Sequence, residues 1–133
     1  MTDIQVGTEI PELALPQVSR YTLALYAGAS GDHNPIHIDS DFAKEAGMPD
    51  VFAHGMLSMA YLGRMLTNWQ PQAKLRKFGN RFAAITHLQD AISCSGKVVE
   101  ILEQDGETLA RCEIQAVKQS GEQSLVGEAL VAL

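Results

Sequence analysis

The chain has 133 residues, of which 46% are hydrophobic and 20% are charged, and its net charge is −6. Such a chain folds as one globular domain over residues 1–133, which excludes a disordered or fibrous protein. Its negative charge opposes binding to nucleic acid and to anionic membranes, and no apolar run approaches the roughly 18 residues of a transmembrane helix. Residues 1–10 lack the cationic and apolar regions of a secretory signal, so a cytoplasmic location is expected.

Short elements are predicted in the first third of the chain. Residues 6–16 contain two prolines and no clear period, which predicts an extended arm with at most a short edge strand. Ser19 is a suitable N-cap for a short helix that ends before Gly31. A second short helix is expected to begin at Asp39 or Ser40, since both residue types cap helices well.

These two helices are joined by GDHNPIH, residues 31–37, which places an acid and an imidazole five positions apart, at Asp32 and His37. Pro35 fixes its own φ and keeps Asn34 out of the α region, so the segment is expected to be extended and stiff. A carboxylate and a histidine that converge on one water would orient it and raise its nucleophilicity. From the residue types alone, a polar surface turn explains the segment equally well.

Residues 54–69 predict the most hydrophobic helix of the chain. Its apolar residues leave only a thin polar stripe at Ser58, Arg64 and Thr67, so we expect the helix to be buried on most sides. Gly55 lies at its start, where a backbone amide lacks an intrahelical acceptor and feels the positive end of the helix dipole. Such an amide can stabilise a developing oxyanion.

Two other histidines, His33 and His54, are expected to be structural. His33 is interpreted as a solvent-facing turn residue and His54 as a helix-start residue packed against its neighbours. The candidate catalytic groups are therefore Asp32, His37 and Gly55. A water-activating pair with an oxyanion donor suits the addition of water to a carbonyl-conjugated substrate, or its removal.

The second half of the chain predicts an antiparallel sheet, with strands over residues 75–86, 91–104, 107–118 and 124–133. The Asp-Gly pair at 105–106 is a strong hairpin signal. A turn centred there pairs Val99 with Cys112. The same register pairs Ile101 with Ala110 and places the apolar residues on one face, so turn and pattern agree. A sheet around one helix is an α+β architecture.

Cys94 and Cys112 form no metal-binding or redox motif, and two cysteines do not make a disulfide framework. The predicted register places Cys94 opposite residue 117 and away from Cys112, which disfavours a disulfide between them. We expect both cysteines to be reduced core residues and expect no metal site.

The segments YAGASGDHNPIHIDSDFAKEAG and AHGML resemble the signature of the MaoC-like, R-specific enoyl-thioester hydratases and dehydratases. The opening VGTEIPE, the RFAA segment and the terminal GEALVAL also resemble family elements, in the right order. The resemblance implies the hot-dog fold, in which a curved antiparallel sheet is wrapped around a long central helix. It implies a hydro-lyase that adds water reversibly to trans-2-enoyl-CoA or to an acyl-carrier-protein thioester, without a metal or redox cofactor.

The resemblance also implies a role for each matched residue. Asp32 and His37 would jointly hold and activate the water. The Gly55 amide would bind the thioester oxygen, and Asn34 would position the loop or a water.

One residue and one loop depart from the family pattern. Gly63 stands where some members have a serine that helps to orient the active site. Residues 85–90 replace a turn that often contains proline and glycine. These departures put substrate fit in doubt more than the class of reaction.

Four of the ten basic residues lie within eight positions, at Lys74, Arg76, Lys77 and Arg81. The cluster could contact the phosphates of coenzyme A or the acidic surface of a carrier protein, and Lys77 and Arg81 are the candidate binding residues. A solvated strand edge, on which lysines discourage aggregation, is an equal alternative.

Met56 and Met59 are candidate residues of an acyl pocket, because methionine fits irregular apolar ligands. Tyr26 and Leu62 could line the same pocket. For most of these four residues, packing in the core is the simpler role.

The family fold commonly completes one sheet across two chains, so the resemblance implies a homodimer. The segments AHGMLSM and LTNW also resemble dehydratase subunits that pair with a related, non-identical chain, which leaves a heterodimer open. Two other functions stay open on the same fold, an acyl-CoA thioesterase and a non-catalytic subunit that binds acyl thioesters. The Asp32 and His37 pair argues against both.

Overall fold

Five strands and one long helix form the body of the protein in a computed structural model that describes residues 3–133. The elements in chain order are β1 (Glu9–Ala14), α1 (Arg20–Ser30), α2 (Ser40–Glu45), α3 (Gly55–Trp69), β2 (Leu75–Phe82), β3 (Ile92–Gln104), β4 (Glu107–Lys118) and β5 (Gln123–Ala132). Every predicted helix and strand is therefore present, with bounds that differ by a few residues at most. None of the helices in residues 3–133 is long and apolar enough to cross a membrane.

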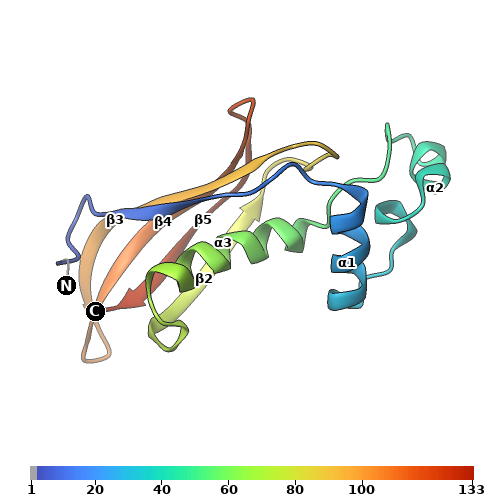
Figure 1. The fold of residues 1–133 in the computed structure, drawn as a ribbon. Coiled ribbons are helices and arrows are strands. Elements are labelled where there is room, and N and C mark those ends of the chain that lie inside the picture. The colour runs from blue at the N-terminus through green and yellow to red at the C-terminus, as the bar shows by residue number, and fades with distance from the viewer. Residues whose placement is uncertain (1–2) are drawn as a thin grey trace.

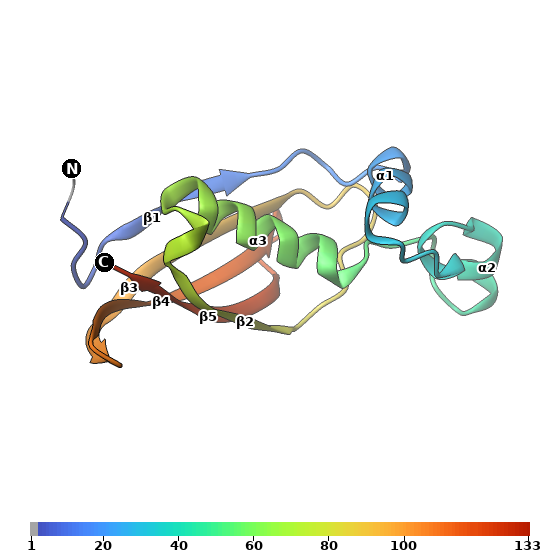
Figure 2. The same ribbon diagram turned by 90° about the horizontal axis from the view of Figure 1, so that it is seen from below.

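The strands form one antiparallel sheet in the order β1-β3-β4-β5-β2. Helix α3 lies across one face of this sheet, and α1 and α2 lie beyond the N-terminal end of α3 (Figures 1 and 2). This is the predicted α+β architecture. The loop between α1 and α2 is thereby brought to the end of α3 at which Gly55 lies.

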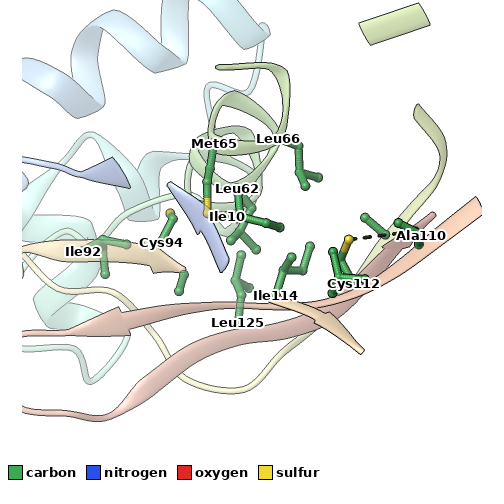
Figure 3. Packing of buried hydrophobic residues seen from close by; sticks show 13 residues of the cluster. Ile10, Leu62, Met65, Leu66, Ile92, Cys94, Ala110, Cys112, Ile114 and Leu125 are labelled. Atoms are coloured by element: carbon green, nitrogen blue, oxygen red, sulfur yellow. Dashed lines mark hydrogen bonds between the residues drawn. The ribbon is translucent and has the colours of Figure 1, made fainter. Parts of the chain in front are cut away.

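The main core lies between α3 and the sheet. Leu62, Met65 and Leu66 of the helix point toward Ile114 and Leu125 of the sheet (Figure 3). All five are almost fully buried. Since burying each such side chain contributes about 1.5–3 kcal/mol, this contact is the main reason that the helix stays on the sheet.

The expectation that α3 is buried on most sides is wrong for this chain. The sheet covers one side of the helix and the α1 and α2 region covers its first turns, whereas Met56 is 54% exposed. The expected polar stripe is also wrong at Ser58, which is 3% exposed. A single five-stranded sheet covers one face of a helix, and periodicity alone cannot show how many sides have a partner.

The hairpin between β3 and β4 confirms the predicted turn but only half of the predicted register. Ile101 faces Ala110 as expected, with Asp105 and the following glycine both at positive φ. A bulge between residues 98 and 100 then shifts the pairing by one residue, so that Val98 faces Cys112. The predicted pairing of Val99 with Cys112 is therefore wrong, because a bulge inserts one residue into one strand only.

Because of the same bulge, Cys94 lies opposite Ala116 and not opposite residue 117. Cys94 and Cys112 are free and fully buried, as predicted. Burial raises the pKa of the Cys94 thiol to about 12 and that of Cys112 to about 11. Neither thiol has the thiolate character that nucleophilic chemistry requires.

A smaller core fixes α1 and α2 against the start of α3. Its buried residues are Val18, Leu23, Ala43, Val51, Ala53 and Leu57. Ser19 caps α1 as predicted, and Asp39 caps α2. Asp50 forms an ion pair with Arg20 and accepts a hydrogen bond from the Ser40 hydroxyl at 2.7 Å. That bond is the main reason that the pKa of Asp50 falls to about 2.

Candidate active site

The segment GDHNPIH is a tight turn followed by a short helix. Gly31 ends α1 at φ 77°, in the left-handed region that glycine adopts most readily. Asn34 has φ −55° and ψ 123°, outside the α region as its neighbour Pro35 requires. Residues 35–37 then form one 3₁₀ turn, so the expectation of an extended segment is wrong from Pro35 onward. A proline at the first helical position suits such a turn.

Two side chains of this segment hold its own backbone. The Asp32 carboxylate accepts a hydrogen bond from the backbone amide of Asn34 at 3.1 Å. The side-chain oxygen of Asn34 accepts one from the backbone amide of Ile36, also at 3.1 Å. Successive turns of this kind limit the conformations of a short loop. Asn34 therefore stabilises the loop that carries Asp32 and His37.

His37 is fixed in one tautomer by its contact with the backbone. Its Nδ1 lies 2.7 Å from the carbonyl oxygen of Phe52, and a carbonyl can only accept, so Nδ1 carries the hydrogen. In the neutral ring the lone pair is then on Nε2. The His37 ring also contacts the Phe52 ring edge-on, with centroids 5.0 Å apart. The free nitrogen is thus the one that could take a proton.

Asp32, His37 and His54 come together although 22 positions separate the first from the last. One carboxylate oxygen of Asp32 and one ring nitrogen of each histidine lie within 4.8 Å of one another. The residue types could hold a metal, but the rings of His37 and His54 are stacked, with centroids 4.0 Å apart and planes 28° apart. Imidazole binds a metal in the plane of its ring, at about 2.0–2.1 Å, and two stacked planes do not converge on one ion. The arrangement suits a water better than a metal.

His54 is buried, with 2% of its surface exposed. Its Nε2 lies 3.1 Å from the backbone carbonyl oxygen of Asp32, and its ring contacts Tyr26 edge-on at 4.8 Å. Burial lowers the pKa of His54, so the ring is neutral. Burial, with the charge of Asp32 as a second cause, raises the pKa of Tyr26, which keeps the phenol protonated.

Gly55 is the first residue of α3, as predicted. Within residues 3–133 its backbone amide donates to no hydrogen-bond acceptor, as expected in the first turn of a helix. A side chain there would meet Phe82, since a Cβ atom on Gly55 would lie 2.9 Å from Cε1 of that ring. The absence of a side chain lets the Phe82 ring and the amide of Gly55 lie close together.

A cavity of about 310 Å³ opens beside Gly55. Its walls are mainly apolar, and its residues are Phe52, Ala53, Gly55, Ser58, Phe82, Ala83, Ala84, Ile85, Thr86, Ser124 and Leu125. The predicted pocket residues Met56 and Met59 do not line it. Met56 is exposed, and Met59 packs against the main core, as do Leu62 and other residues of α3.

Two residues of the basic cluster, Arg76 and Lys77, are engaged in ion pairs. The Arg76 guanidinium donates two hydrogen bonds to Glu107, at 2.9 and 2.8 Å, and Lys77 lies 2.8 Å from Glu128. Arg81 is exposed and forms no ion pair within residues 3–133. Of the two predicted phosphate-binding residues, only Arg81 has an uncommitted charge.

Both departures from the family pattern have a structural explanation. A Cβ atom on Gly63 would lie 3.3 Å from the ring of Phe78, so a larger side chain would need that ring to move. In the loop at 85–90, the carbonyl of Thr86 accepts a hydrogen bond from Ala53 at 2.9 Å. This bond joins the loop to the segment before α3 and keeps Thr86 in the cavity wall.

Sequence reasoning missed two residues that contact the predicted catalytic groups. His54 was interpreted as a packing residue, yet it contacts both Asp32 and His37. Phe82 lies over Gly55 although 27 positions separate them. The position of His54 directly before Gly55 was a usable signal. The contact of Phe82 depends on how β2 packs beside α3, and no local pattern encodes it.

Comparison with known proteins gives one family match. Residues 5–120 match the family model described as "MaoC like domain". The "3-hydroxyacyl-[acyl-carrier-protein] dehydratase FERN, mitochondrial" of Solanum lycopersicum is 27% identical over 108 residues, which cover 81% of this chain and 66% of that protein. The "Fatty acid synthase subunit beta" of Saccharomyces cerevisiae is 36% identical over 66 residues, which cover 50% of this chain and 3% of that protein.

Among solved structures, the unliganded R-hydratase PhaJ1 from Pseudomonas aeruginosa has a TM-score of 0.81 and 29% identity, and the match covers 97% of this chain and 82% of that one. This likeness confirms the hot-dog fold that the sequence resemblance implied. The chain corresponds to only a small part of the fatty acid synthase subunit and to about two thirds of the tomato protein.

Proposed function

Because the chain belongs to the MaoC-like domain family, we propose that it catalyses the reversible addition of water to a trans-2-enoyl thioester, which gives an R-3-hydroxyacyl thioester. The observation that carries this proposal is the convergence of Asp32 and His37, with Nε2 of the imidazole free, beside the N-terminal end of α3. The similarity to proteins named R-hydratase and 3-hydroxyacyl dehydratase supports the same reaction.

In the hydration direction, Asp32 and His37 hold one water, and His37 Nε2 takes a proton from it. The water oxygen attacks the β-carbon, and the electron pair of the double bond moves through the α-carbon to the thioester oxygen. The Gly55 amide stabilises the negative charge that develops there, a contribution typically of about 3–4 kcal/mol. The α-carbon then takes up the proton held on His37, which restores the neutral ring. Dehydration follows the same steps in reverse.

The substrate is proposed to be a coenzyme A or carrier-protein thioester. Arg81 is the basic residue proposed to contact the phosphates, because it is exposed and its charge is uncommitted. Lys77 could contribute only by exchanging Glu128 for a phosphate. The acyl chain is proposed to occupy the mainly apolar cavity beside Gly55, which neither Met56 nor Met59 lines.

The reaction is tested with crotonyl-CoA by following the loss of the enoyl absorbance. Asp32→Asn and His37→Gln should each lower kcat by at least about a hundredfold, because each removes a group that contacts the water. His33→Gln is the matched control, since His33 is exposed and adjacent, and it should retain full activity. Wild-type activity in both site variants would contradict the mechanism.

The alternative functions are separated in the same assay. A thioesterase would release free coenzyme A, which a thiol reagent detects, whereas hydration leaves the thioester intact. A purely binding subunit would show neither signal but would still bind the thioester. The hydratase proposal requires loss of the enoyl absorbance without thiol release.

Two chains are proposed to associate through the outer edge of β2. This strand ends the sheet and, within residues 3–133, pairs only with β5, so its other edge carries unpaired backbone groups. Exposed apolar side chains lie at or near it, with Phe82 at 52% and Ile85 at 42% exposure. A related non-identical hot-dog chain would fit the same edge. A cytoplasmic location stays a prediction, because the tomato relative is named as mitochondrial.

A further inference from the structure

His54 joins three parts of the molecule at the candidate active site. Its Nε2 contacts the backbone of Asp32, its ring face lies on His37, and its ring is edge-on to Tyr26 of α1. Its own backbone continues directly into Gly55. Among the hydrogen bonds and aromatic contacts within residues 3–133, His54 is the one side chain that engages both members of the proposed catalytic pair.

We propose that His54 is a positioning residue, which holds the Asp32 loop and the His37 ring in the geometry that activates the water. This inference rests on the proposed hydratase function, and it adds to that function a residue that does not itself touch substrate.

The hydrogen bond is the first part of the argument. Asp32 lies on an exposed loop, and within residues 3–133 its side chain and backbone amide form hydrogen bonds only with the nearby Asn34 and Ser30. The bond from His54 to the Asp32 carbonyl therefore ties the Asp32 end of this loop to the start of α3, as the bond from His37 to Phe52 ties its other end. Since the carbonyl can only accept, Nε2 of His54 carries the hydrogen.

Stacking is the second part. The Nδ1 atom of His37 is held by the Phe52 carbonyl, which fixes one point of the ring but leaves it able to swing about that point. The His54 ring on one face, with centroids 4.0 Å apart, limits this motion and directs Nε2. At least one of the two stacked rings must be neutral, because two imidazolium cations would repel each other. The titratable groups that face His54 are His37, Asp32 and Tyr26.

The buried Nδ1 of His54 is the third part. Within the described chain it has no hydrogen-bond partner. A buried acceptor without a partner destabilises a fold, and a phenylalanine would fill the same space without that cost. Packing therefore does not account for an imidazole at this position, whereas the bond to Asp32 does.

Two substitutions separate the two contacts. His54→Phe keeps an aromatic face for His37 but removes the donor to Asp32. His54→Gln places an amide N–H where it can reach the same carbonyl but removes the ring. His33→Phe is the control, because it makes the same change at the adjacent exposed histidine.

We expect His54→Phe to lower kcat for crotonyl-CoA hydration by about tenfold to a hundredfold, because small displacements of catalytic groups have effects of this size. KM should stay within about twofold and the Tm should not fall, since a buried polar atom is removed. His54→Gln should recover most of kcat. His33→Phe should behave as wild type.

The inference is wrong if His54→Phe keeps kcat within twofold of wild type, or if both variants lose kcat only in proportion to a fall in Tm. Wild-type protein that is inactive on both crotonyl-CoA and a crotonyl carrier-protein thioester would instead refute the proposed function. In that case the backbone amide chemical shifts of residues 32–34, 36 and 37 test the positioning role directly. They should move in His54→Phe and much less in His54→Gln, and unchanged shifts in His54→Phe would overturn the inference.

Discussion

At the scale of single residues, the candidate site is built mainly from backbone contacts. The carbonyl of Phe52 sets the tautomer of His37, and the carbonyl of Asp32 does the same for His54. The Gly55 amide is available because it begins a helix. Side-chain identity supplies the carboxylate and the imidazoles, whereas neighbouring peptide groups fix the tautomers of His37 and His54.

Gly55→Ala tests the residue proposed to bind the thioester oxygen. The new Cβ would lie 2.9 Å from the Phe82 ring and would block close approach to the amide, so kcat/KM should fall by about a hundredfold or more. Stability should change little, because the exposed Phe82 ring can move. Gly28→Ala in α1, where a Cβ meets no atom within 4 Å, is the control. The free energy of unfolding of Gly28→Ala should rise by about 0.5–1 kcal/mol, and this variant should retain activity. An equal loss of kcat/KM in both variants would contradict the proposed role of Gly55.

At the scale of elements, strands β2 and β5 approach each other closely at Gly127. A Cβ atom on Gly127 would lie 2.2 Å from the backbone oxygen of Gly79 and 2.4 Å from Cβ of Asn80. Only glycine permits this approach. The contact matters for the site because β2 also carries Phe82, which lies over Gly55.

Gly127→Ala should therefore lower the free energy of unfolding by about 1–3 kcal/mol, since backbone atoms must move apart. Urea unfolding followed by circular dichroism measures this change. Gly79→Ala on the facing strand is the matched control, because a Cβ there meets nothing within 4 Å. An equal free energy of unfolding for Gly127→Ala and wild type would contradict this prediction, because the strands would then move apart without a loss of stability.

At the scale of the whole molecule, one face of α3 lacks cover. The sheet buries Leu62 and Met65 on one side, while Met56 remains exposed on the other. A sequence this apolar over a whole helix is better explained if a second chain contributes cover. The unpaired edge of β2 is the place at which one sheet could continue into another.

Light scattering after size-exclusion chromatography should therefore give the mass of two chains, each of 14.4 kDa. Hydrogen exchange should then show protection of the outward-facing amides of β2 but not of those of β1, the other edge of the sheet. A monomer, or a dimer with unprotected β2 amides, would contradict the proposed edge. A requirement for a second, non-identical chain would favour the heterodimer.

The sequence determined the secondary structure and indicated Asp32 and His37 as the proposed catalytic pair. Ser19, Asp39 and the Asp-Gly pair at 105–106 mark their elements by local capping and turn chemistry, which depend on only a few neighbouring residues. Where a longer pattern was extrapolated, it failed at the bulge near residue 99, because an inserted residue leaves no clear mark on a run of apolar residues.

Tertiary structure alone decided which groups meet. The stack of His54 on His37, the Phe82 ring over Gly55 and the pairing of Lys77 with Glu128 each join parts of the chain that are far apart in sequence. Such contacts depend on how α3, β2 and the α1–α2 loop pack together. Local propensity specifies each element, but only packing fixes the distances between them, and those distances decide which residues can share one water.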